Sequence, residues 1–360
     1  MVAPQITLWD KLTIPTNLLR AMAAALFRLA LRPFTGGNKP RDLFKDVVFA
    51  ALRSNLANAN LAQERYVDST TEANYLALAK RKNFQPEIEV LGSTGAKALW
   101  LGNKSAEKVI LFFHGGGYVL AASNGHIEWC FELQEALSKD SGKKVAVCML
   151  AYSLAPEEHY PTQLKQAAAS LEYLIEKEGR QPSEIIVGGD SAGGNCAMGL
   201  MSHMLHPHPD LNTPVLAKLQ QPLAGALLIS PWGNFDTDDK PHRNRHSDMI
   251  ATETAQRWGG AFLGGAKRDN YNMPVMADAS WFNGIDSKFR EILVWGGGGE
   301  VLIDSIDVLA QKFKRAHPRT EYVVEQGACH EEFIIEKLIG YKEKGEGTKL
   351  IENWVQKVFA

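Results

Sequence analysis

The stretch "IIVGGDSAGGNCAMGL", residues 185–200, decides how the rest of the chain is interpreted. An apolar, strand-like run ends at Gly188, and the five residues 189–193, "GDSAG", match G-x-S-x-G before helix-compatible sequence. Strand, tight turn and helix are the context in which this motif presents a serine on a strained turn. A phosphate-binding loop fits less well, because no G-K-[ST] follows and the glycine spacing is not G-x-G-x-x-G. Ser191 is therefore predicted to be a nucleophile.

The segments on both sides of this motif predict the fold. Apolar, strand-like runs alternate with amphipathic helix-like segments, among them "KVILFF" (108–113), "KVAVCML" (144–150), "AGALLIS" (224–230) and "EILVWGG" (291–297). Strands that are apolar throughout are typical of a parallel sheet covered by helices on both faces. We predict an α/β protein with a doubly wound, mostly parallel sheet over residues 86–360.

Two segments fall outside this alternation and predict a helical cap. Residues 1–85 are helix-like and form the predicted N-terminal cap segment. Residues 233–285 form a predicted cap insertion, which is long enough to serve as a functional lid. Some of the aromatic residues in these segments are expected to cover the serine and the others to fill the core: Phe27, Phe34, Phe44, Phe235, Trp258, Phe262 and Trp281.

A helix-like window near the N-terminus is amphipathic. Arg20 and Arg28 interrupt it, so neither a signal peptide nor a membrane span is expected. The pattern favours a helix packed on its own protein, with a substrate-entry lid or a weak membrane-surface contact as the alternatives. Its apolar residues fall on one side: Leu18, Leu19, Met22, Leu26 and Leu29.

Composition and net charge limit the kinds of partner that the protein is expected to bind. A chain of 360 residues with 45% hydrophobic residues can bury a large core, and a formal net charge of -2 gives no electrostatic footprint for nucleic acid. The acidic run "DTDDK" (236–240) lacks the spacing of a calcium loop and is expected to be solvated. We expect a cytoplasmic protein with four reduced, mostly buried thiols, Cys130, Cys148, Cys196 and Cys329.

A serine nucleophile needs a base, and the base needs an orienting acid. His330 follows a late strand in "EYVVEQGACHEEF", where a loop can present it at the sheet edge. The histidines at 203–208 are expected in a solvated turn, with a metal site as the alternative, and His317 is expected at a surface helix end. Glu300, directly after the strand "EILVWGG", is the favoured acid, with Asp304 one helical turn later as the second candidate.

With these residues in view, the chain resembles the hormone-sensitive-lipase-like branch of the α/β-hydrolases. That branch is marked by an HGGG motif, here residues 114–117, and by G-D-S-A-G-G, here residues 189–194. "YSLAPEEHYPTQL" (152–164) and "SPW" (230–232) extend the resemblance over roughly residues 87–340. Three positions depart from it: Glu300 replaces the usual aspartate, Ser153 an arginine, and Glu331-Glu332 a small residue and an aromatic one.

The resemblance implies an oxyanion hole made by backbone N–H groups. Those of Gly115, Gly116, Gly117 and Ala192 are the candidates, and we expect Gly116 and Gly117 to be the principal donors of the glycine loop. The glycines are interpreted as positions where a Cβ would occupy the space of the oxyanion. His114 is expected to fix the loop through its side chain, and Tyr118 to line the pocket or join the core.

The predicted activity is that of a serine carboxylic-ester hydrolase with a Ser-His-Glu triad and an acyl-enzyme. We expect it to act on short acyl esters, for example acetates, of small and moderately apolar alcohols. No metal or organic cofactor is expected. An acyltransferase or an amidase or formamidase could use the same acyl-enzyme, and a catalytically silent small-molecule-binding protein is the remaining alternative. The sequence leaves the oligomeric state open.

Overall fold

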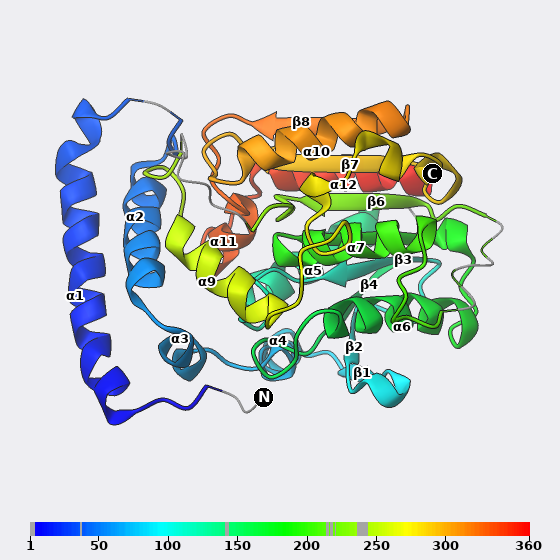
Figure 1. Ribbon diagram of the computed structural model, residues 1–360, viewed down its shortest axis with the longest axis horizontal. Helices are drawn as coiled ribbons and strands as arrows, with labels where there is room; N and C mark the ends of the chain where they lie inside the picture. The colour runs from blue at the N-terminus through cyan, green and yellow to red at the C-terminus, as the bar shows by residue number, and fades with distance from the viewer. Residues whose placement is uncertain are drawn as a thin grey trace.

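The computed structural model describes residues 4–36, 38–140, 144–213, 216, 219, 221–235 and 244–360. Its centre is an eight-stranded sheet in the order β1-β2-β4-β3-β5-β6-β7-β8 (Figure 1). β1 pairs antiparallel with β2, and β2 antiparallel with β4, whereas all later neighbours are parallel. The predicted mostly parallel sheet is confirmed. The strands are β1 Glu87–Val90, β2 Lys97–Leu101, β3 Lys108–Phe113, β4 Val145–Ala151, β5 Ile185–Asp190, β6 Gly225–Ile229, β7 Ile292–Gly297 and β8 Thr320–Glu325.

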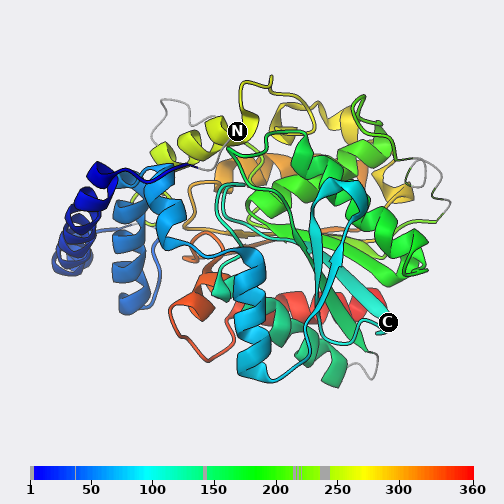
Figure 2. The ribbon, with the colours of Figure 1, turned by 90° about the horizontal axis from the view of Figure 1, so that it is seen from below.

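Helices cover both faces of the sheet (Figures 1 and 2). The inner strands alternate their side chains between two buried clusters, because successive residues of a strand point to opposite faces. In β3, Val109 and Leu111 join the cluster under α6, α7 and α10, while Ile110 and Phe112 join the one under α5 and α12. These helices span Asn124–Asp140 (α5), Thr162–Glu176 (α6), Ala192–Leu205 (α7), Ile303–Ala316 (α10), Glu332–Leu338 (α11) and Glu346–Phe359 (α12).

The remaining helices are α1 Leu8–Leu31, α2 Leu43–Asn58, α3 Leu61–Val67, α4 Thr71–Lys82 and, from the predicted insertion, α9 Thr252–Leu263. Of these, α1, α2, α3 and α9 lie at one end of the sheet (Figure 1), whereas α4 packs against α5. Short 3₁₀ helices lie at Arg32–Phe34, Gly92–Thr94, Pro182–Glu184, Pro274–Met276, Ala279–Phe282 and Ile285–Ser287. The run 236–240, for which a solvated loop was expected, lies outside the described residues.

Buried polar contacts join the N-terminal helices to the insertion. Glu64 of α3 accepts hydrogen bonds from Arg257 NH2 at 2.6 Å and from the Trp258 indole at 3.0 Å. Glu64 is buried, and burial raises the pKa of its carboxyl. Arg65 anchors the same helix to the body of the protein through the Val119 carbonyl at 2.9 Å. The two sequence segments therefore form one helical cap.

The amphipathic window forms α1, but its orientation differs from the expectation of an apolar face packed inward. Leu19 and Leu26 are 65% and 66% exposed, whereas Asn17 and Arg28 are buried. The reason is that the inner side of α1 makes buried polar bonds, such as Arg28 Nε to Asp46 at 2.9 Å. Within the described residues, Leu8–Phe34 is the one stretch long and apolar enough to cross a membrane by length and composition, and 17% of its apolar window is buried.

Candidate active site

Ser191 occupies the sharp turn between β5 and α7. Its φ is 49° and its ψ is -114°, a conformation that side chains rarely adopt. A Cβ on Gly193 would lie 1.9 Å from the Phe113 carbonyl oxygen, and one on Gly189 would lie 2.5 Å from Gly193. The glycines of the motif are thus required by close backbone approach, as their spacing predicts. The turn holds the serine at the N-terminus of α7, where unpaired N–H groups lie.

His330 and Glu300 come together in the buried interior. The Nδ1 of His330 lies 2.7 Å from Glu300 Oε2, and both side chains are fully buried. The other carboxylate oxygen, Oε1, accepts from Ser230 Oγ at 3.0 Å and from the Gly297 N–H at 2.6 Å. With both oxygens bonded, the carboxylate can fix the orientation of the imidazole ring. Nε2 is then the ring nitrogen that can accept or donate a proton.

Asp304, the second candidate for the acid, lies elsewhere. It is exposed in the first turn of α10. Glu300 precedes that helix and turns back beneath the sheet edge, so the two carboxylates do not share one helix face as expected. The extra methylene of Glu300 lets its carboxylate reach Nδ1 from this loop.

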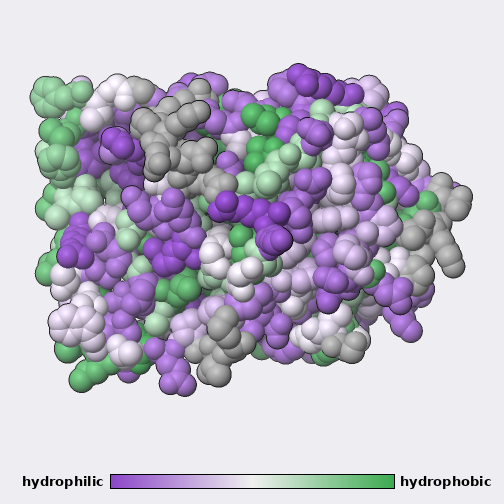
Figure 3. Space-filling view, in the orientation of Figure 1, coloured by the Kyte–Doolittle hydropathy of each residue, from purple (hydrophilic) through white to green (hydrophobic). Residues whose placement is uncertain are grey.

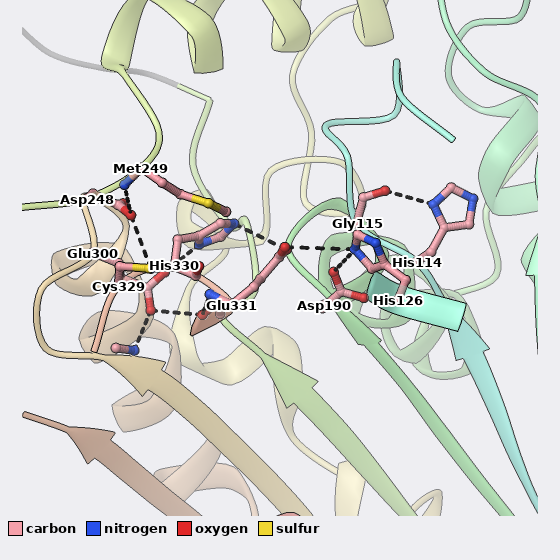
Figure 4. Close-up of polar contacts among 12 residues, drawn as sticks. His114, Gly115, His126, Asp190, Asp248, Met249, Glu300, Cys329, His330 and Glu331 are labelled. Carbon is pink, nitrogen blue, oxygen red and sulfur yellow. Dashed lines mark hydrogen bonds and ion pairs between the residues drawn. The ribbon is translucent and has the colours of Figure 1, made fainter. Parts of the chain in front are cut away.

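A second carboxylate lies against the opposite side of the imidazole. Glu331 Oε1 is 3.3 Å from His330 Nε2 (Figure 4). Glu331 is buried, and its φ of 52° lies in the left-handed region. The family that the sequence resembles has a small residue at this position. The departure noted in the sequence therefore places a carboxyl group beside Nε2 of His330.

Glu331 also belongs to a buried cluster with Asp190 and His126. His126 Nε2 lies 3.0 Å from Asp190 Oδ2 and 3.8 Å from Glu331 Oε2 (Figure 4). These three are the one group of described residues whose donor atoms lie close enough together, within 4.8 Å, to hold a metal ion. Since Asp190 Oδ2 already lies within hydrogen-bond distance of His126, these side chains satisfy one another in part.

Burial and neighbouring charges shift the pKa values of this cluster. Burial raises the pKa of Asp190 to about 6, and burial together with the negative charge of Asp190 raises the pKa of Glu331. For His330, burial acts to lower the pKa, but the carboxylates of Glu331 and Glu300 outweigh it and hold the pKa well above its usual value. The surroundings of His330 therefore favour its protonated, imidazolium form.

We expect Glu331→Gln to move the acid limb of the pH profile toward lower pH. Removing one negative charge destabilises the imidazolium, so the His330 pKa falls and the neutral base becomes available at lower pH. The expected shift in the kcat/KM profile for p-nitrophenyl acetate is about one pH unit. Glu332→Gln is the matched control, because that carboxylate contacts Lys45 instead. Identical acid limbs in the two variants would contradict the assignment.

The glycine loop of residues 114–117 packs more tightly than expected. A Cβ on Gly115 would lie 2.2 Å from Asp190 Oδ2, and one on Gly117 would lie 2.2 Å from the Trp258 ring. Gly116 and Gly117 also have φ values of 96° and 61°. The expectation that side chains here would fill the space of the oxyanion is therefore wrong. The glycines are needed for positive φ and for contact with the protein.

The backbone N–H groups of this loop differ in whether they already have an acceptor in the protein. The Gly115 N–H faces the Asp190 carboxyl, whose pKa it acts to lower. Within the described part of the chain, the N–H groups of Gly116, Gly117 and Ala192 donate to no protein acceptor. His114 holds the loop by bonding the Gly115 carbonyl at 2.7 Å, and Tyr118 is buried against Phe262, stacked at 3.9 Å between ring centroids.

The other histidines are not in solvated positions as expected. His203 is buried and bonds Thr213, and His208 Nε2 lies 2.9 Å from the Tyr160 hydroxyl. His206 stacks on Trp281, with ring centroids 3.9 Å apart. His317 is fully buried and bonds the Phe289 carbonyl at 2.8 Å. Packing of the 3₁₀ segments against α7 and α10 covers these side chains, which local sequence does not reveal.

Asp248 is a buried support of the site that the sequence did not single out. Its Oδ1 accepts from the His330 N–H at 3.1 Å and its Oδ2 from the Val301 N–H at 2.7 Å. One side chain therefore ties the histidine loop to the segment that follows Glu300. Asp248 comes from the predicted insertion, far from either loop in the sequence, and neither a motif nor a strand end marks it.

A cavity of about 500 Å³ connects the site with the cap. Ser191, His330, Glu331 and Gly116 lie on its wall. Most of the other lining residues are apolar and come from both cap segments and α11: Ile14, Leu18, Leu52, Leu56, Val67, Met249, Ile250, Trp258, Ile335 and Leu338. Of the seven aromatic residues expected to cover the serine or fill the core, Trp258 is the one on this wall. This volume suits an apolar small molecule.

Comparison with known proteins agrees with this fold. The family of proteins with the alpha/beta hydrolase fold matches residues 110–334, and the chain belongs to this family. An acetyl-hydrolase from Streptomyces hygroscopicus is 28% identical over 58% of this chain and 62% of its own length. An ethyl acetate hydrolase from Pseudomonas putida is 31% identical over 35% of this chain and 38% of its own.

This chain therefore spans less than two thirds of the length of these two relatives. Among solved structures, an esterase from the bacterial hormone-sensitive lipase family superposes with a TM-score of 0.62. That superposition covers 96% of this chain and 99% of the other, at 22% identity. The likeness therefore extends over the cap as well as the sheet.

Proposed function

We propose that the protein is a serine carboxylic-ester hydrolase that removes a short acyl group, such as acetyl, from an apolar alcohol. The observation that carries the proposal is the joint placement of Ser191 and His330 on one apolar cavity, with Glu300 bonded behind the histidine. The names of the relatives, an acetyl-hydrolase and an ethyl acetate hydrolase, support ester hydrolysis and a short acyl group.

In the proposed acylation step, neutral His330 takes the proton of the Ser191 hydroxyl at Nε2. The serine oxygen then attacks the ester carbonyl carbon, and negative charge develops on the carbonyl oxygen. The unpaired N–H groups of Gly116, Gly117 and Ala192 are the proposed donors to that oxygen. One such donor is typically worth about 3–4 kcal/mol in the transition state.

In the second half of the cycle, His330 gives up the proton that it took from Ser191. Imidazolium at His330 protonates the leaving alcohol, and the acyl group stays on Ser191 as an ester. A water molecule, deprotonated by the same Nε2, then attacks that ester and releases the acid. Throughout, Glu300 holds Nδ1–H, so the ring keeps the tautomer that the reaction needs.

The cavity supports an apolar alcohol as the larger part of the substrate. Most of the residues on its wall are apolar. Each methylene of the alcohol that leaves water gains about 0.8 kcal/mol, or roughly fourfold in binding. Charged alcohols would have to shed their hydration without compensation and are expected to be poor substrates.

A panel of esters tests this substrate class. Along p-nitrophenyl acetate, butyrate, octanoate and palmitate, we expect kcat/KM to be highest for the two short chains. Along acetates of ethanol, hexanol and a cyclic apolar alcohol, we expect it to rise. A maximum at octanoate or palmitate would contradict the short-acyl proposal. Transfer of the acyl group to an added alcohol, with little free acid, would indicate an acyltransferase instead.

A further inference from the structure

The outer face of α1 is apolar over its whole length, although it faces away from the rest of the protein. Figure 1 shows α1 at the edge of the molecule, beyond α2, and Figure 3 shows hydrophobic residues along that edge. Leu8, Leu12, Leu19, Met22 and Leu26 are each more than 60% exposed. Their three-, four- and seven-residue spacings place them on one side of the helix. We call these five residues the α1 stripe.

The inner side of α1 makes buried polar contacts beside the small side chain of Ala21, whereas a helix that packs on a soluble core usually buries its large apolar residues. Arg28 pairs with Asp46 of α2 at 2.8 Å, and Asn17 Nδ2 bonds Gln63 Oε1 of α3 at 3.3 Å. Breaking a buried charge pair is strongly destabilising, so these contacts oppose rotation of the helix. The α1 stripe is therefore held outward by the fold.

Aromatic residues extend the stripe at both ends. Trp9, in the first turn, is 72% exposed, and Phe34, in the 3₁₀ helix after α1, is 85% exposed. Phe27 beside the stripe is 67% exposed. Large aromatic rings at the two ends of an apolar segment are typical of chains that lie at the boundary between lipid headgroups and acyl chains. A contiguous exposed patch of this kind marks an interaction surface.

The charges around the stripe are mostly positive. Residues 1–42 contain six basic residues and two acidic ones: Lys11, Arg20, Arg28, Arg32, Lys39 and Arg41 against Asp10 and Asp42. Arg28 and Arg32 are paired with Asp46. Residues 1–42 therefore have a net positive charge, although the whole chain has a formal net charge of -2. Such a segment is attracted to anionic lipid headgroups.

We propose that the α1 stripe, with Trp9, Phe27 and Phe34, docks on an anionic lipid surface, with α1 lying in the plane of the headgroups. A helix of 24 residues is about 36 Å long and would present the stripe along its whole length. Spanning the bilayer instead would carry Arg20 and Arg28 into the hydrocarbon and break the Asp46 pair. A second copy of the chain fits less well, because two like-charged segments would face each other.

Docking would also bring lipid close to the proposed active site. Ile14 and Leu18 of α1 lie on the wall of the cavity that contains Ser191, while the neighbouring Leu19 belongs to the stripe. An apolar ester dissolved in the lipid would thus need to pass only one helix to reach the cavity. The docking surface itself does not rest on the proposed hydrolase activity, because its contacts involve none of the reacting groups.

Vesicle flotation of the full-length protein tests the proposal. We expect wild type to float with vesicles of phosphatidylcholine containing about 30% phosphatidylglycerol, and to bind pure phosphatidylcholine vesicles more weakly. The variant L19D/L26D/F27D should lose more than about 100-fold in partition coefficient, because three large apolar groups are replaced by charges. L76D/V90D/V308D is the matched control, since these exposed apolar residues lie on α4, β1 and α10.

The activity assay separates failure of docking from failure of folding. Both triple variants should retain wild-type hydrolysis of p-nitrophenyl acetate if that activity is present, and both should retain the wild-type far-ultraviolet circular dichroism spectrum. Ser191→Ala should float like wild type. The proposal would be overturned if wild type binds neither kind of vesicle. It would also be overturned if L19D/L26D/F27D binds as well as wild type. A wild-type dimer that L19D/L26D/F27D converts to a monomer would assign the stripe to a second copy and would overturn it as well.

Discussion

Ser191→Ala is expected to lower kcat for p-nitrophenyl acetate by about 10⁴-fold or more. The alanine has no oxygen to form the acyl-enzyme, and only binding and the backbone donors remain to accelerate attack by water. The turn should persist, since alanine and serine differ by one oxygen and the side chain makes no hydrogen bond that the helix needs. The measurement is kcat under saturating ester, with the unfolding temperature as the control for folding.

His330→Ala is the companion variant and should be about as inactive as Ser191→Ala, because the two residues act as a unit. The double variant should lose little beyond either single change. Near-normal turnover in either single variant, with a normal unfolding temperature, would exclude this serine and histidine as the reacting pair. Loss of labelling by a fluorophosphonate probe in Ser191→Ala alone would identify the nucleophile independently of the substrate used.

Glu300→Gln is expected to lower kcat by about 10³–10⁴-fold. Its amide can donate a hydrogen bond to Nδ1, which favours the tautomer with the proton on Nε2, where the serine proton must go. Glu300 is fully buried and lies 2.7 Å from that nitrogen. Asp304→Asn serves as the matched control, because it changes an exposed acid in the next helical turn. We expect that variant to keep activity within about threefold of wild type.

A reversed order, with Asp304→Asn the more damaging change, would move the acid role to α10. Because Glu300 Oε1 also accepts from Ser230 and Gly297, the substitution could lower stability as well as activity. Activity is therefore compared well below the unfolding temperature of each variant. Glu300→Asp adds a further check, since it keeps the charge but withdraws it by one methylene, and partial activity is expected.

Much of the fold can be predicted from the local sequence. The strands around Ser191 are predominantly apolar, as is typical of strands that are buried on both faces of a sheet. The four cysteines are buried and free, as their spacing predicts. The nucleophile turn was also accessible, since the backbone contacts of Gly189 and Gly193 leave no room for a side chain. These features depend on neighbours within a few residues, so the sequence pattern contains them.

Other features depend on residues far apart in the chain. Glu331 could be recognised as unusual from its place after His330, but only the folded chain brings it to Asp190 and His126. Asp248 meets the histidine loop across 82 positions of sequence. No periodicity or motif encodes such a contact, because it arises from the way the insertion folds back over the sheet edge.

The sequence by itself determined the sheet, the serine turn and the order in which serine, acid and histidine occur along the chain. Local hydrophobic pattern and the steric demands of backbone turns are sufficient for these features. Only the tertiary structure decided which carboxylates face His330 and which side of α1 faces outward. Both depend on contacts between residues far apart in the sequence, and the local apolar pattern does not encode such contacts.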